Sequence, residues 1–173
     1  AIGMCTAIAA RMAGASKVAV SEIEAGKIAR IQRLGFDVIN PRECDGVQRV
    51  RQLTDGHGFN CVFEASGAPA GYELLTKAGS YRAKGVNIGM NFKPSPLITR
   101  DIMVTEMRIQ AIRIHQQSVF GLTANMFAHL SEQAKQSLYT LISDDYDFEH
   151  LKDAFEFCVN DRSYCKVMVK ISG

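Results

Sequence analysis

Apolar residues along the chain fall into two alternating patterns. Short runs of mostly β-branched residues predict buried strands, and the segments between them, whose apolar residues recur every three or four positions, predict helices. The predicted strands are Lys17–Ser21, Asp37–Asn40, Asn60–Ser66 and Gly85–Met90. The predicted helices are Met4–Ala13, Ala25–Leu34, Gly46–Leu53 and Ala70–Ala78. Strands that alternate with helices require crossover connections, so the pattern predicts a doubly wound α/β fold with a mostly parallel sheet.

The alternation of short strands and helices changes after about residue 106. Met107–His115 alternates apolar and polar residues, which predicts a strand with one buried face. Two helices and a final strand are predicted after it, at Val119–Leu130, Phe148–Cys158 and Lys166–Ile171. The stretch QSLYTLISDDYDF fits either a helix or an extended chain. We therefore expect two structural parts, residues 1–116 and residues 117–173.

Composition and charge exclude several classes of protein. Apolar residues make up 47% of the chain and charged residues 22%, which is ordinary for a globular domain. The net charge of +2, without blocks of like charge, argues against a nucleic-acid partner or an anionic membrane surface. No apolar run approaches the roughly 20 residues that span a bilayer, and no secretory signal is visible, so a cytoplasmic location is expected.

The cysteines and histidines do not form a recognisable metal motif. The five cysteines are odd in number and include no C-x-x-C pair, which favours reduced thiols over disulfides. The four histidines are distant from one another in the sequence. Because a structural zinc site needs about four clustered Cys or His ligands, we expect no metal site within these 173 residues.

The first 27 residues contain two features of a dinucleotide-binding βαβ unit. Gly3 opens the first predicted helix, where free backbone N–H groups can bind a pyrophosphate. Glu22 ends the strand that follows, at the place where an acidic residue binds the adenosine ribose and repels a 2′-phosphate. This pair favours NAD over NADP. Taken alone, however, a glycine before a helix and an exposed glutamate after a strand are also common where no ligand binds.

Longer segments resemble a known family. The chain is similar to the coenzyme-binding region of medium-chain, zinc-type alcohol dehydrogenases, the group that contains sorbitol and threonine dehydrogenases. The matching segments are GASKVAVSEIEAGKIARIQRLGFDVINP, LTDGHGFNCVFEASGAP, GVNIGM and DFEHLKDAFEFC with KVMVKI, in the family's order and spacing. The resemblance implies a Rossmann fold and NAD as coenzyme.

The resemblance also implies roles for individual residues. Ile2 and Gly3 match the end of the glycine fingerprint under the pyrophosphate, and Lys166 matches a basic residue that reaches the same group. Glu22 and Lys27 match residues that contact the adenosine ribose. For Lys27 and Lys166, the alternative that they are solvent-exposed lysines with no ligand has equal weight.

Four further matching residues follow two strands. Ser66 and Gly67 match the adenine and ribose side of the coenzyme site, and Gly89 and Met90 match the positions whose backbone meets the nicotinamide carboxamide. Three positions depart from the family pattern: Asn60 replaces an Asp, Ala83–Gly85 replaces a more glycine- or proline-rich turn, and AIRIHQ (residues 111–116) replaces a glycine-containing turn. The last change puts the nicotinamide-side contacts in doubt.

The resemblance covers only part of a family enzyme. We expect the first strand of the Rossmann sheet and a GroES-like catalytic domain with the zinc ligands to lie outside this chain, which alone is expected to be inactive and poorly stable. Residues 117–173 would pack on that domain, since apolar surface on Leu151, Ala154, Phe155 and Val167 needs a cover. The strand at Arg108–Ile114 is expected to join subunits of a homo-oligomer, although an ordinary covered edge is the alternative.

The expected activity is hydride transfer from an alcohol or polyol to NAD. Two alternatives stay open at this point. The first is a zinc-free quinone or enoyl reductase of the same superfamily, against which Glu22 argues because those enzymes commonly use NADPH. The second is a non-catalytic NAD-binding module. The substrate itself cannot be deduced from these residues.

Overall fold

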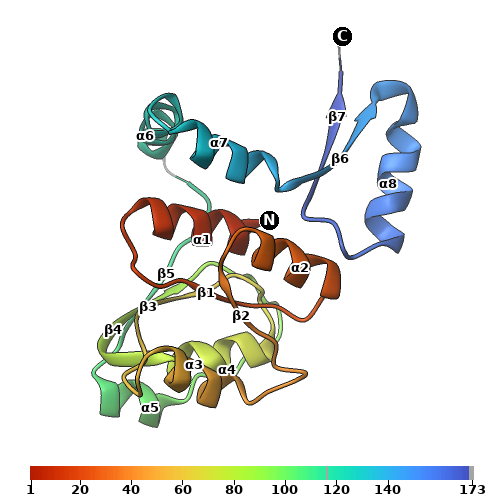
Figure 1. Ribbon diagram of the computed structural model, residues 1–173. Helices are drawn as coiled ribbons and strands as arrows, with labels where there is room; N and C mark the ends of the chain where they lie inside the picture. Colours follow the sequence, from red (N-terminus) through yellow and green to blue (C-terminus); the bar gives the residue numbers. More distant parts are fainter. Residues whose placement is uncertain (116, 172–173) are drawn as a thin grey trace. The chain divides into compact units, whose positions relative to one another are not determined.

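The computed structural model describes residues 1–115 and 117–171, which form two compact units (Figure 1). The first unit contains residues 1 and 3–38 together with the segment from residue 117 onward. The second contains residue 2 and residues 39–115, the rest of the described part. The division expected from the sequence, 1–116 and 117–173, remains a prediction, and Gln116, Ser172 and Gly173 lie outside the described residues.

The first unit begins with two helices and two short strands. They are α1 (Ile2–Met12), β1 (Ala19–Ser21), α2 (Ala25–Arg33) and β2 (Asp37–Ile39), and β1 pairs with β2. Met4, Ala7 and Ile8 lie at helical spacing on α1 and pack in one core cluster with Ile31 of α2 and with Phe36. This apolar face explains why the N-terminal segment is helical and where it docks.

Arg11, at the end of α1, stabilises the C-terminal end of α2. Its guanidinium donates hydrogen bonds to the carbonyl oxygens of Leu34 (2.6 Å) and Gly35 (2.8 Å). The same group lies 3.6 Å from the centroid of the Phe36 ring. The guanidinium thereby binds carbonyl groups that the end of the helix leaves without partners. Its positive charge also interacts favourably with the negative end of the helix dipole and with the aromatic ring.

The rest of the first unit is the C-terminal segment. Its elements are α6 (Gln117–Ala128), α7 (Glu132–Tyr139), β6 (Ile142–Asp147), the short 3-10 helix Phe148–His150, α8 (Leu151–Asn160) and β7 (Lys166–Lys170). Strands β6 and β7 are parallel, and α8 packs beside them (Figure 1). The stretch that fitted either a helix or a strand contains both, since α7 ends at Tyr139 and β6 begins at Ile142.

The second unit is a three-stranded parallel sheet with three helices. Its elements are α3 (Gly46–Leu53), β3 (Phe59–Glu64), α4 (Pro69–Lys77), β4 (Gly79–Asn87), α5 (Thr99–Thr105) and β5 (Arg108–Ala111), with strand order β3-β4-β5. Both strand pairs are parallel, and Leu75, Ala83 and Met107 form a buried cluster. The expected α/β class with parallel strands is therefore confirmed.

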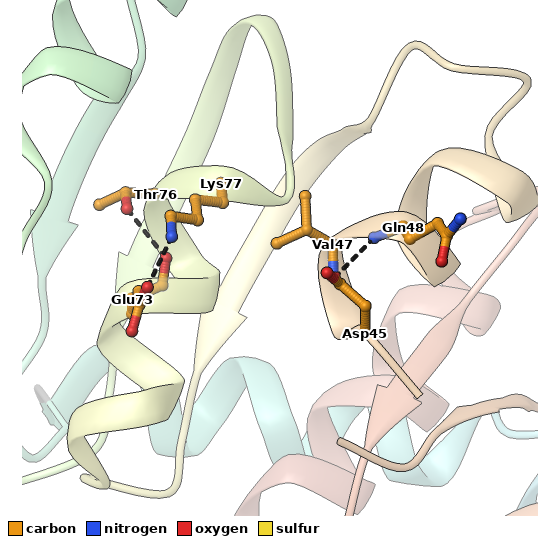
Figure 2. Close-up of polar contacts among 6 residues, drawn as sticks. All are labelled: Asp45, Val47, Gln48, Glu73, Thr76 and Lys77. Carbon is orange, nitrogen blue, oxygen red and sulfur yellow. Dashed lines mark hydrogen bonds and ion pairs between the residues drawn. The ribbon is translucent and has the colours of Figure 1, made fainter. Parts of the chain in front are cut away.

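Local side-chain bonds fix two of these helices. Asp45 caps α3, because its Oδ1 accepts hydrogen bonds from the backbone N–H groups of Val47 (2.8 Å) and Gln48 (3.0 Å) (Figure 2). Near the end of α4, Lys77 forms an ion pair of 2.5 Å with Glu73, one helical turn earlier (Figure 2). The hydrogen bond that Lys77 donates to the Glu73 carboxylate is the main cause of a raised pKa at Lys77. Side-chain interactions thus stabilise the start of α3, through Asp45, and the last turn of α4, through Lys77 and Glu73.

The last strand of this sheet is shorter than the sequence predicts. The expected strand over Arg108–Ile114 is wrong beyond Ala111, where β5 ends. Ile112 still donates a backbone hydrogen bond of 3.0 Å to the carbonyl oxygen of Asn87. Ile114, however, has a φ of +56°, in the left-handed region, and an extended strand cannot continue through that conformation. The alternation of apolar and polar residues in the sequence therefore continues beyond Ala111, where the strand ends.

Candidate functional site

Glu22 lies between the end of β1 and the start of α2, in the first unit. Its Oε1 accepts hydrogen bonds from the backbone N–H groups of Ile23 (2.8 Å) and Glu24 (3.1 Å), and the side chain is half-buried. These two bonds hold the carboxylate at the end of the strand instead of leaving it free on the surface. Lys27, in the first turn of α2, is also half-buried.

Gly3 and Lys166 belong to the same unit. Gly3 belongs to the first turn of α1, where helical N–H groups lack partners within the helix. Two residues on, the pKa of the Cys5 thiol is raised, mainly by burial and further by Cys165, while Lys166 acts in the opposite direction. Cys165, the residue before β7, packs in one buried core cluster with Met4 and Ala7 of α1. A helix N-terminus with a nearby lysine can bind an anion such as a pyrophosphate.

In the second unit, the residues after β3 lie against the residues after β4. Gly67 has a φ of +70°, and a Cβ at this position would lie 2.5 Å from the carbonyl oxygen of Met90. A Cβ on Gly89 would lie 2.3 Å from the backbone nitrogen of Gly67. Both positions therefore need glycine, because the two segments approach more closely than any side chain allows. Ser66, Gly67, Gly89 and Met90, predicted separately from the sequence, are brought together.

Glu64, the last residue of β3, was not among the residues predicted from the sequence. It is 4% exposed, and its Oε1 accepts hydrogen bonds from the Ser66 N–H (2.8 Å), the Ser66 hydroxyl (2.5 Å) and the Gly67 N–H (3.0 Å). The signal in the sequence is a single acidic residue at the end of an apolar run, NCVFE. That signal is weak, since the same pattern ends many strands whose last side chain is in water.

The predicted residues divide between the two units. Gly3, Glu22, Lys27 and Lys166 belong to the first unit, and Ile2, Ser66, Gly67, Gly89 and Met90 belong to the second. Ile2 is 57% exposed at the start of α1, and Met90 is 66% exposed, so neither side chain is part of a core. Ile2 and Gly3 lie at the N-terminus of α1, and Ser66, Gly67, Gly89 and Met90 follow the carboxyl ends of the parallel strands β3 and β4, where open α/β sheets bind their ligands. Lys166 is the first residue of β7.

The described residues contain neither a metal cluster nor a membrane-spanning helix. Among residues 1–115 and 117–171, no three His, Cys, Asp or Glu side chains gather closely enough to hold a metal ion. Over the same residues, each helix is too short or too polar to cross a bilayer.

Comparison with known proteins identifies relatives along most of the chain. The family profile described as zinc-binding dehydrogenase matches residues 1–130. L-threonine 3-dehydrogenase of Symbiobacterium thermophilum is 33% identical over 172 residues, which cover 97% of this chain and 48% of that protein.

Solved structures show the same fold. 2R,3R-butanediol dehydrogenase from Bacillus subtilis superposes with a TM-score of 0.84 at 18% identity, over 99% of this chain and 48% of that one. An alcohol dehydrogenase of Escherichia coli CFT073, crystallised with NADH, superposes with a TM-score of 0.82 at 19% identity. The match covers 98% of this chain and 49% of that one. The chain thus spans about half the length of these relatives, and it matches their Rossmann part.

Proposed function

Because the chain belongs to the zinc-binding dehydrogenase family, we propose that it is the coenzyme-binding part of an NAD-dependent alcohol or polyol dehydrogenase. The observation that carries the choice of NAD is the Glu22 carboxylate, which two backbone N–H groups hold at the end of β1. A carboxylate at this place accepts hydrogen bonds from the ribose hydroxyls of NAD and repels the 2′-phosphate of NADP.

The other residues of the site fit the same coenzyme. Lys27 would contact the ribose beside Glu22, and the first turn of α1, with Ile2 and Gly3, would bind the pyrophosphate together with Lys166. In the second unit, Ser66 and Gly67 would contact the adenine and ribose side, and the backbone of Gly89 and Met90 would contact the carboxamide. NAD, when bound, supplies the hydride acceptor of the reaction.

The substrate class rests on the named relatives. L-threonine 3-dehydrogenase, sorbitol dehydrogenase and butanediol dehydrogenase are among them, and their names describe oxidation of an alcohol. We propose an alcohol or polyol substrate for the whole protein, with zinc bound by residues outside these 173. The five cysteines are free thiols, which supports a reducing compartment such as the cytoplasm.

We also propose that the whole protein forms a homo-oligomer through β5. This strand is at the edge of the sheet, with β4 as its partner among the described residues. An exposed strand edge carries unpaired backbone groups that a second copy can pair with. The contact would involve Arg108–Ala111 and the residues up to Ile114.

The test compares the two coenzymes on the full-length protein. We expect NAD to raise the melting temperature more than NADP does, because only the folded state binds the coenzyme. Glu22→Ala should weaken NAD binding about tenfold, as expected for loss of hydrogen bonds to a charged group, and should reverse the preference. Glu24→Ala is the matched control, since this acidic residue follows in the same turn and its side chain does not cap α2. Equal stabilisation by NAD and NADP would contradict the assignment of Glu22.

A further inference from the structure

Glu64 is a buried carboxylate that binds the backbone of its own turn. It is 4% exposed, and both of its oxygens contact the Gly67 N–H, at 3.0 Å for Oε1 and 3.1 Å for Oε2. Oε1 also accepts the N–H and the hydroxyl of Ser66. Hydrogen bonds from backbone amides to a carboxylate are stronger than those between neutral groups, so this turn has little freedom to change its shape.

The same residue also contacts the segment that follows β4. Its carbonyl oxygen accepts hydrogen bonds from the N–H groups of Ile88 (2.7 Å) and Gly89 (2.9 Å). A Cβ on Gly89 would lie 2.2 Å from Oε2 of Glu64, so the carboxylate fills the space beside this glycine. The backbone and the side chain of Glu64 thus contact both segments of the predicted coenzyme site in this unit.

Tyr72 holds the second segment from the other side. This residue of α4 is 7% exposed, and its hydroxyl donates a hydrogen bond of 2.9 Å to the carbonyl oxygen of Gly89. Gly89 therefore has its N–H bonded to the backbone carbonyl of Glu64 and its C=O bonded to the Tyr72 hydroxyl. Two buried residues with no predicted contact to the coenzyme thus fix its position.

We propose that Glu64, together with Tyr72, positions the coenzyme contacts of this unit. The Glu64 carboxylate fixes the Ser66–Gly67 turn, and the Tyr72 hydroxyl fixes the Gly89 segment that packs against this turn, so that both are in place before NAD binds. A site that is ordered in advance loses less conformational entropy on binding, and the saving appears as affinity. This inference rests on the proposed function, because it takes the four held residues to be coenzyme contacts.

The test is a pair of isosteric substitutions in the full-length protein. Glu64→Gln keeps the shape of the side chain but places an NH2 group where one oxygen faces the Gly67 N–H or the Gly89 segment. Glu73→Gln is the matched control, because Glu73 lies in the same unit, is half-exposed and pairs with Lys77. Isothermal titration with NADH and with ADP-ribose, which lacks the nicotinamide, measures the affinities, and thermal melting measures stability.

We expect Glu64→Gln to weaken binding of NADH and of ADP-ribose about five- to tenfold, because its carboxylate bonds Ser66 and Gly67, the proposed contacts of the adenine and ribose side that both ligands share. Glu73→Gln should change neither affinity. A merely structural role would lower the melting temperature and leave both affinities of the folded protein unchanged, and that result would overturn the inference. A wild-type protein that does not bind NADH would instead overturn the proposed function.

A second variant decides the question if Glu64→Gln does not fold. Tyr72→Phe keeps the buried ring and removes only the hydroxyl that bonds to the carbonyl oxygen of Gly89. Weaker NADH binding by about threefold, with unchanged ADP-ribose binding, would support positioning of the nicotinamide half. Unchanged binding of both ligands by this variant would refute it.

Discussion

At the scale of single residues, backbone conformation identifies one strained position. Asp55, Arg82, Glu106 and Ile114 have positive φ angles among the described residues. The first three have polar or charged side chains, whereas Ile114 is β-branched and 74% exposed. Its left-handed conformation ends the extended segment after β5. The strain is therefore a direct result of a β-branched residue in the left-handed region.

Ile114→Gly should relieve this strain. The left-handed region costs an L-residue about 1–2 kcal/mol, and part of that gain is lost because glycine makes the unfolded chain more flexible. We expect the free energy of unfolding to rise by about 0.5–1 kcal/mol, as measured by urea denaturation of the full-length protein. Ile112→Gly, at a position with an ordinary backbone conformation, should lower it. A loss of stability in Ile114→Gly would show that the side chain has a packing partner in the whole protein.

At the scale of elements, the sequence predicts best where local signals agree. Helix α3 spans Gly46–Leu53 as predicted, because a capping Asp45 and the buried Val50 and Leu53 mark its ends and its inner face. Strand β4 begins at Gly79, six residues before the predicted Gly85, since SYRAK contains too many polar residues to indicate a strand. Helix α5 was not predicted at all, and it has no buried residue to give an apolar stripe.

The candidate site shows the same limit. Gly3 and Glu22 could be predicted from their spacing, whereas Gly67 and Gly89 were predicted from the resemblance to the family. Glu64 was not predicted, because its burial depends on N–H groups of a turn and on a neighbouring strand end. The packing of Cys165 against Met4 of α1 also depends on tertiary structure, since 161 positions separate the two residues.

The cap of α3 gives a prediction at this scale. Asp45→Ala removes the acceptor of the Val47 and Gln48 N–H groups and should lower the free energy of unfolding by about 1 kcal/mol. Urea denaturation measures the change. Glu43→Ala serves as control, since it removes an exposed acidic residue just before the same helix. Equal effects of both substitutions would indicate a general charge effect and not a cap.

At the scale of the whole molecule, the C-terminal segment exposes several large apolar side chains. Helix α6 has no buried residue in the described structure, and its apolar side chains Phe120, Leu122, Met126 and Phe127 are between 42% and 69% exposed. In α8, Ala154 is buried but Phe155 is 66% exposed. Contiguous exposed apolar surface commonly marks an interface. This supports the proposal that the segment packs on a catalytic domain in the complete protein.

Oxidation of methionines tests this packing. Met126 is 42% exposed here and should be oxidised by hydrogen peroxide much faster in the 173-residue chain than in the full-length protein. Mass spectrometry of peptides gives both rates. Met4 is the internal reference, because it is 7% exposed and should react slowly in both proteins. Equal rates at Met126 would show that another surface contacts the rest of the protein.

The contact between Glu64 and Gly89 also constrains how this family can vary. An alanine or serine in place of Gly89 would meet the carboxylate at 2.2 Å and the backbone nitrogen of Gly67 at 2.3 Å, so no single substitution that adds a Cβ fits while the Ser66–Gly67 turn keeps its place. A shorter side chain at Glu64 would remove only the first of these contacts. A relative with a larger residue at the position of Gly89 should therefore differ in the path of this turn, and not only at the position of Glu64, 25 residues earlier.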